Sequence, residues 1–305
     1  MGDLKGHALP GSLFLFYGLW WALCCMRRYL NCRKAGRRYI ATATYGCPCA
    51  CGRLGSLPIE AILKIFLSAV GMFCEITFNL PHPSHGIVQH ATMYFFFLLS
   101  GIVDVVMHAG VPLPPGSDYM GIVLAFTVEG LLFANHLHDR PVLDVHIHVL
   151  LVYVVFLTVV VIMLEAKFQR SAILAMSRAY LLMLQGSWFW AVGIILYGHG
   201  DENTVWDMKS HEHVMLSTIY FSWHCAAHFI ILFFMCLGLY LLHRRINGPL
   251  PNGSGPSSIP LTQLGDNGKS EGYRRLAFTD EVEEDSDIEF EKPVEKALVP
   301  AGSNV

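Results

Sequence analysis

Seven long apolar segments recur along the chain, and short polar connections separate them. Each segment is close to the roughly 20 residues that an α-helix needs to cross about 30 Å of hydrocarbon. The apolar runs are continuous and do not alternate with a period of two, which favours helices over a membrane β-barrel. The pattern predicts an all-α integral membrane protein, a bundle of about seven transmembrane helices, over residues 8–26, 57–78, 87–107, 118–137, 146–166, 173–198 and 213–242.

The connections between these segments are short and rich in proline and glycine, for example at 81–84, 111–116 and 139–141. Such residues punctuate helices and favour turns. Because the connections are short, consecutive helices are expected to be antiparallel neighbours.

The pattern changes after Gly248, where prolines and glycines precede an acidic run at 280–289. A segment of this composition cannot bury enough apolar surface to order itself. We therefore expect two parts, a seven-helix transmembrane domain at 1–247 and a disordered acidic cytoplasmic tail at 248–305. The stretch Tyr273–Leu276 resembles a tyrosine-based sorting signal, which makes a sorting adaptor a candidate partner and the plasma membrane or the endosomal and Golgi system the expected location. A tail that is simply solvated is the competing interpretation.

Composition agrees with the membrane assignment. Of the 305 residues, 53% are hydrophobic and 15% are charged, whereas soluble domains carry about 25% charged residues. The lipid bilayer is thus the first expected partner. The net charge of -3 provides no general attraction for nucleic acid, so no nucleic-acid partner is expected.

The basic residues that flank the segments predict an orientation. If the N-terminus is outside, eleven Lys and Arg residues fall on the cytoplasmic side and three fall outside. The excess of Lys and Arg in cytoplasmic loops favours this arrangement, with the C-terminus inside.

Histidine is the residue type with the most informative placement. On the predicted topology, eleven of the fifteen histidines lie in outer loops or at outer helix ends. Carboxylates share this layer, and the spacing of Asp144 and His148 at i, i+4 places them on one helix face. Ionisable groups at membrane depth usually face the bundle interior and are candidates for a functional site. The candidate metal ligands are His90, Glu129, His136, His138, Asp144, His148 and His224.

Three interpretations of this layer stay open. Imidazoles oriented by carboxylates suit a metal ion, for which zinc is the candidate. The same residues suit a proton-sensing or ligand-binding cavity, because histidine titrates near physiological pH. They also suit hydrogen-bonded pairs that only fix the packing of the helices.

Other polar residues in the apolar segments have local explanations. Glu60 and Lys64 are four residues apart and are expected to pair with each other. Arg178 is expected to reach the membrane interface by extending its side chain.

The sequence contains neither a glycine-rich phosphate loop nor a nucleophile elbow. A non-enzymatic membrane protein with a metal or proton site is therefore the leading interpretation. The alternative is a zinc-dependent intramembrane hydrolase, because His224 and His228 reproduce the His-x-x-x-His pair on the last helix of ceramidase-type and adiponectin-receptor-type membrane proteins.

A series of motifs along residues 1–245 resembles the transmembrane protein 45 family, which includes the transmembrane epididymal proteins. The resemblance implies a multi-pass membrane protein without a settled biochemical activity. Within the family, the motifs are more similar to those of the epididymal branch. The motifs are Gly6-His7-Ala8-Leu9-Pro10-Gly11, Gln89-His90-Ala91-Thr92-Met93-Tyr94, Ser100-Gly101-Ile102-Val103-Asp104, Glu129-Gly130, His136-Leu137-His138, Leu143-Asp144-Val145-His146-Ile147-His148, Leu184-Gln185-Gly186-Ser187-Trp188-Phe189 and Trp223-His224.

The predicted orientation has a direct test. Asn252-Gly253-Ser254 is the only N-glycosylation sequon in the sequence, and it lies on the predicted cytoplasmic side. We expect Asn252 to stay unmodified, so treatment with a glycosidase should leave the mobility of the protein on a gel unchanged. A glycan at Asn252 would reverse the orientation and move the histidine layer to the cytoplasmic side.

Overall fold

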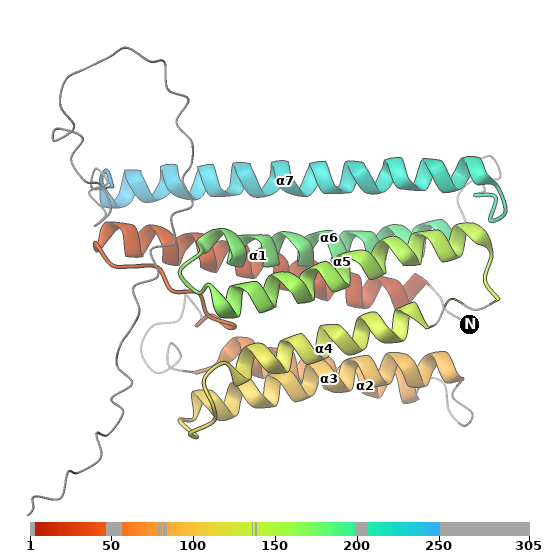
Figure 1. The fold of residues 1–305 in the computed structure, drawn as a ribbon, viewed down its shortest axis with the longest axis horizontal. Coiled ribbons are helices and arrows are strands. Elements are labelled where there is room, and N and C mark those ends of the chain that lie inside the picture. Colours follow the sequence, from red (N-terminus) through yellow and green to blue (C-terminus); the bar gives the residue numbers. More distant parts are fainter. Residues whose placement is uncertain are drawn as a thin grey trace, which may run out of the picture. The chain divides into compact units, whose positions relative to one another are not determined.

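All secondary structure in the part of the chain that can be described is helical. The computed structural model describes residues 4–46, 57–77, 81, 84–135, 137, 139–198 and 206–250. Seven helices follow one another in these ranges (Figure 1): α1 (Leu4–Lys34), α2 (Ile59–Thr77), α3 (His85–His108), α4 (Ser117–Ala134), α5 (Val142–Lys167), α6 (Ala172–Tyr197) and α7 (His211–Asn247). Six of these described helices are long and apolar enough to cross a membrane. The prediction of an all-α integral membrane protein is confirmed.

The helix ends differ from the sequence prediction mainly in α1 and α7. The predicted segments 8–26 and 213–242 become helices of 31 and 37 residues. Both helices continue beyond their apolar runs into basic residues, which interact favourably with the negative end of the helix dipole. The end of α7 at Asn247 coincides with the predicted end of the transmembrane domain. Residues 251–305, including Tyr273–Leu276, lie outside the described residues, so the tail and its sorting signal stay predictions.

The helices run in alternating directions, as the short connections predict (Figure 1). Each of α2 to α6 packs on the next or previous helix in the chain, α6 packs on α1, and α7 packs on α1, α5 and α6. Within the described helices, no Cα atom of α1 comes within 8 Å of a Cα atom of α2, α3 or α4. Long side chains alone therefore bridge the distance between α1 and these three helices.

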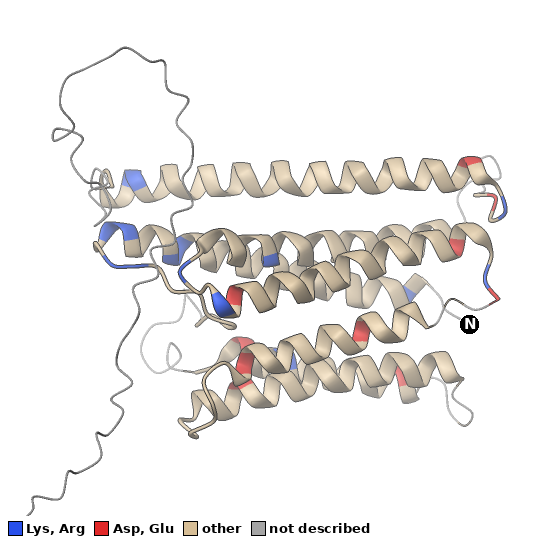
Figure 2. Cartoon of the chain, in the orientation of Figure 1, with Lys and Arg blue, Asp and Glu red and all other residues tan. Residues whose placement is uncertain are grey.

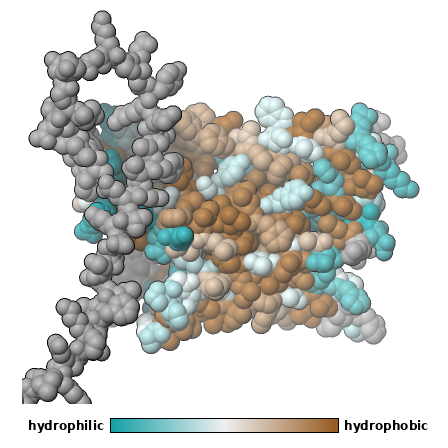
Figure 3. Space-filling view, viewed as in Figure 1, coloured by the Kyte–Doolittle hydropathy of each residue, from teal (hydrophilic) through white to brown (hydrophobic). Residues whose placement is uncertain are grey.

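Charged residues gather at the ends of the helices (Figure 2). The last turns of α1, α5 and α7 carry Arg33, Lys34, Lys167, Arg244 and Arg245, and we call this end of the bundle the basic end. The opposite end, where α1, α3 and α7 carry histidines in their first turns and α5 carries His146 and His148 shortly after its start, is called the histidine end. Between the two ends, apolar side chains cover the face seen in Figure 3. Large apolar residues such as Phe66 and Phe73 of α2 are 60% and 67% exposed, which suits contact with lipid.

The α2 helix falls outside the six apolar spans because it carries Glu60, Lys64 and Glu75. All three side chains have partners inside the bundle. Glu60 accepts hydrogen bonds from the indoles of Trp20 and Trp21 at 2.9 and 2.7 Å, Lys64 forms an ion pair with Asp104, and Glu75 lies beside His90. Because charged groups at membrane depth persist when they are paired within the protein, α2 lies beside α3 despite its charges.

These contacts correct two sequence predictions. Glu60 and Lys64 do not pair with each other, because residues of α1 and α3 provide better partners. Arg178 does not extend to the interface. Its side chain is fully buried, with Nε 3.1 Å from Glu165 Oε2, and it donates hydrogen bonds to the backbone oxygens of Thr42 and Ala43. Both predictions considered only the local sequence.

The closest helix contact in the bundle joins α1 to α6. A Cβ atom placed on Gly186 would lie 2.6 Å from the backbone oxygen of Gly11 and 2.6 Å from the backbone nitrogen of Leu15. Since no side chain can move aside to relieve these contacts, the glycine is required for the two backbones to approach. Small residues play this role widely at helix contacts in membranes.

We expect Gly186→Ala to lower the free energy of unfolding by roughly 1–3 kcal/mol, the usual cost of overpacking. Gly238→Ala is the matched control, because a Cβ atom on this helical glycine of α7 meets nothing within 4 Å. The control should be neutral or slightly stabilising, since alanine is the better helix former. Thermal unfolding of the purified variants in detergent measures both effects, and equal losses from the two changes would contradict the close contact.

Candidate intramembrane cavity

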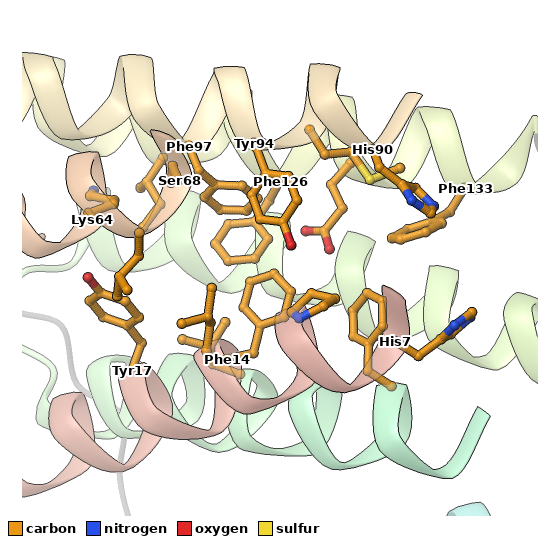
Figure 4. Close-up of a pocket in the computed structure, with 18 of the residues that line it drawn as sticks. His7, Phe14, Tyr17, Lys64, Ser68, His90, Tyr94, Phe97, Phe126 and Phe133 are labelled. Carbon is orange, nitrogen blue, oxygen red and sulfur yellow. The ribbon is translucent and has the colours of Figure 1, made fainter. Parts of the chain in front are cut away.

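A cavity of about 100 Å³ lies between α1, α6 and the group formed by α2, α3 and α4. It occupies the region where α1 does not approach α2, α3 and α4. Figure 4 shows Lys64 and Tyr17 near one end of the cavity and His7 and His90 near the other. The rings of Phe14, Phe97, Phe126, Tyr94, Phe133 and Phe189 provide most of the aromatic lining.

The aromatic rings in the middle of the cavity contact one another. The ring centroids of Phe97 and Phe126 are 5.2 Å apart in an edge-to-face arrangement, and those of Phe14 and Phe97 are 5.7 Å apart. These are distances at which aromatic pairs attract each other. The rings hold α1, α3 and α4 at a fixed separation and give the cavity an apolar wall.

Glu129 of α4 is the polar residue that stands out in this lining. Its side chain is 2% exposed, and its Oε1 atom accepts a hydrogen bond of 2.9 Å from Nε2 of Gln185 on α6. Its Oε2 atom is buried and has no hydrogen-bond partner among the described residues. A buried carboxyl oxygen without a partner is costly in apolar surroundings.

At the histidine end, the cavity is lined by a second acid and by two histidines. Nδ1 of His90 lies 3.4 Å from Oε1 of Glu75, so an imidazole accompanies that carboxyl group. The ring of His7 lies 5.5 Å from the ring of Tyr197 and 6.0 Å from that of His148. Polar groups therefore line the histidine end of an otherwise aromatic cavity.

At the opposite end of the cavity, Lys64 is already compensated. It forms an ion pair with Asp104 and donates a hydrogen bond of 3.1 Å to Ser100 Oγ. Tyr17, which lines the same end, reaches the backbone oxygen of Glu60 at 3.4 Å. The positive charge of Lys64 is thus held by its own partners.

Asp144 and His148 form a pair at the start of α5. Nδ1 of His148 lies 2.8 Å from both the carboxylate and the backbone oxygen of Asp144, and Arg140 contacts the same carboxylate at 3.2 Å. Since both partners of Nδ1 are acceptors, this nitrogen carries the proton. The predicted pairing of Asp144 with His148 on one helix face is present.

His224 and His228 of α7 both meet a serine of α6. Nδ1 of His224 lies 3.0 Å from Ser187 Oγ, and Nε2 of His228 lies 2.7 Å from it. A hydroxyl group has one proton, so at least one of the two imidazoles donates to the serine. This contact attaches α7 to α6.

The seven candidate ligands do not form one cluster in the described part of the chain. His90 accompanies Glu75, Glu129 accompanies Gln185, Asp144 accompanies His148, and His224 accompanies Ser187. His136 and His138 lie outside the described residues. The described residues hold no group of three or more His, Cys, Asp or Glu side chains placed to share a metal ion. The zinc site and the zinc-dependent hydrolase therefore stay predictions.

Gln185 and Ser187 are site residues that were not among the candidate ligands from the sequence, where they suggest only a small polar patch for close helix contact. They stand with Gly186 as a short polar interruption in α6. That interruption was the available signal, but a sequence cannot show that Gln185 meets α4 while Ser187 meets α7.

The fold and the cavity define a multi-pass α-helical membrane protein with an internal cavity lined by aromatic and ionisable residues. Residues 117–237 match the model of a family of unknown function (DUF716). The chain is also similar to curated transmembrane proteins. It is 25% identical over 241 residues to transmembrane epididymal protein 1A of Mus musculus and 26% identical over 244 residues to transmembrane epididymal protein 1 of Rattus norvegicus, in each case over 73% of this chain and 76% of the relative.

A human relative, transmembrane epididymal protein 1 of Homo sapiens, is 29% identical over 137 residues, which cover 45% of this chain and 50% of the relative. These similarities agree with the epididymal side of the resemblance noted in the sequence. The names of these relatives describe transmembrane proteins, which agrees with the membrane assignment of this chain.

The separate pairs predict how histidine substitutions combine. His148→Ala and His224→Ala should each lower the free energy of unfolding by about 0.5–1.5 kcal/mol, because each removes a hydrogen bond, to Asp144 or to Ser187. Since the two histidines have different partners, the double variant should lose the sum to within about 0.5 kcal/mol. Thermal unfolding combined with elemental analysis is the measurement. Coupling well above that margin, together with loss of a bound metal, would show that a shared ion joins the pairs.

Proposed function

We propose that this protein binds a small, mainly apolar ligand in the cavity between α1, α3 and α4. The observation that carries the proposal is Glu129, whose Oε2 atom has no partner among the described residues while its side chain lines the cavity. Ligand sites in proteins combine an apolar, aromatic lining with a few placed polar groups. This cavity has the same composition.

The size of the cavity limits what enters it. Its volume of about 100 Å³ can be compared with the engineered cavity of about 150 Å³ that binds benzene in another protein. The enclosed part of a ligand is therefore no larger than a single ring or a short branched group. Because the cavity is not fully enclosed, a longer ligand can extend beyond it.

The energetics favour a ligand over a purely structural role for Glu129. A carboxyl group that only joined α4 to α6 would need no second, unpartnered oxygen, and a neutral amide would serve the contact with Gln185 equally well. Leaving a buried polar atom without a partner costs about 1–3 kcal/mol. A ligand that donates to Oε2 removes this cost, so the empty site is prepared for a donor.

We further propose an orientation with the N-terminus and the histidine end outside, so that the cavity opens toward the outer half of the bilayer. The distribution of flanking Lys and Arg supports this orientation. The sequence motifs support a relationship with the transmembrane protein 45 family, and Tyr273–Leu276 supports a location in the plasma membrane or the endosomal and Golgi system.

The binding proposal can be tested with benzyl alcohol and benzylamine, which match the enclosed volume. We expect at least one of them to raise the Tm of the purified protein in a concentration-dependent manner, because a ligand that binds only the folded state stabilises it. Ser68→Phe, which places a ring in the lining, should remove the effect.

The control is the behaviour of the variant without ligand. Ser68→Phe should elute as a single species and unfold cooperatively, and the milder Ser68→Leu provides a second blocking variant if it does not. If the ligands raise the Tm of the wild type and of folded blocking variants equally, the effect comes from ligand in the detergent phase. This result would refute the cavity as the binding site.

A further inference from the structure

We infer that the ligand of this cavity is a protonated primary amine, with Glu129 as its counter-ion. The inference rests on the proposed ligand-binding function and adds the chemical class of the ligand. It follows from the distribution of charge among the polar residues that line the cavity.

The acidic and basic side chains around the cavity differ in whether they have an oppositely charged partner. Lys64 is paired with Asp104 and Ser100, and Glu75 has His90 beside it. Glu129 has only the neutral amide of Gln185 as its hydrogen-bond partner among the described residues. A cation is thus missing beside one carboxyl group, whereas no described cationic side chain in the lining lacks an anion. This balance favours a positively charged ligand over a negatively charged one.

The aromatic wall favours the same charge. Phe126 stands one helical turn before Glu129 on α4, and its ring packs against Phe97 and Phe14. The faces of aromatic rings attract cations, and the attraction is stronger when the cation is removed from water. Carboxylate and rings therefore act on the same bound group, and neither would favour an anion.

The carboxyl group also selects the kind of cation. Oε2 is an acceptor when ionised, and a hydrogen bond from a charged N–H group is about twice as strong as one between neutral groups. A primary ammonium group provides such donors, and its small size suits the cavity. A quaternary ammonium group has no N–H and is bulkier, so it would lose this contact.

The depth of Glu129 is compatible with two sources of the amine. Glu129 lies five residues before Ala134, the last residue of α4, which corresponds to about 8 Å along the helix axis. A free lipophilic amine reaches this depth by partitioning into the bilayer, and an amino group on a lipid reaches it from the interface. Both sources present the same ammonium group to Glu129.

The test compares benzylamine with benzyl alcohol, which have the same ring and nearly the same shape. Binding is measured by thermal shift and by calorimetry on the full-length protein in phosphatidylcholine nanodiscs. We expect benzylamine to bind the wild type at least about tenfold more tightly than benzyl alcohol, because its hydrogen bond to Glu129 is charged. Glu129→Gln keeps the shape and the contact with Gln185, and it should reduce the preference to about twofold or less while benzyl alcohol binds as before.

Glu212→Gln is the matched control, since it removes one carboxylate from an exposed position at the start of α7. It should keep the full preference for benzylamine. Equal affinities of the two probes for the wild type would overturn the inference and leave the cavity as a site for neutral ligands, and so would a preference that survives in Glu129→Gln. Binding of neither probe to the wild type would instead refute the proposed function itself.

A second comparison identifies the source of the amine. Nanodiscs that contain phosphatidylethanolamine supply a primary ammonium group on a lipid. Weaker benzylamine binding there than in phosphatidylcholine alone would show that the lipid headgroup competes for Glu129. Unchanged binding would show that the site takes free amines.

Discussion

Burial of charge inside the helix bundle is the constraint on which the arrangement of this protein depends. Arg178 of α6 is fully buried, and a guanidinium group in such surroundings is tolerated only with partners. Glu165 of α5 provides the ion pair, and the ring of Trp21 lies 4.3 Å from the guanidinium carbon. Hydrogen bonds to the backbone of 42–43 hold the segment that follows α1. One side chain therefore connects α1, α5, α6 and that segment.

The same principle organises α2 and, through it, the cavity. Glu60 binds two indoles of α1 and the backbone N–H of Tyr45, while Lys64 binds Asp104 of α3. These contacts join α1 to α2 near the basic end, where the backbones do not approach each other. Toward the histidine end, contacts between aromatic rings separate α1 from α3 and α4. These rings do not fill all of the volume between the helices. The cavity is thus a consequence of holding α1 at a distance through long side chains.

The number of helices and the pairing of Asp144 with His148 followed from the sequence because both depend on local features. A run of apolar residues is visible without knowing its neighbours, and so is the i, i+4 spacing of Asp144 and His148. The partners of Glu60, Lys64 and Arg178 depended on which helices lie side by side. Local pairing rules failed for them because Trp20, Asp104 and Glu165 come from other helices.

Glu129 shows the limit of sequence reasoning most clearly. The sequence made it a candidate ligand of the histidine layer. In the structure, one of its oxygens accepts a hydrogen bond from Gln185 of α6, and the other has no hydrogen-bond partner among the described residues, while the residue lines an aromatic cavity. In a bundle where Glu60, Glu165 and Asp104 all have charged or multiple donors, a carboxyl group with a single neutral donor is the exception. Because the other fully buried carboxylates among the described residues have a cation or several donors, the unpartnered oxygen of Glu129 supports our proposal of a partner from outside the chain.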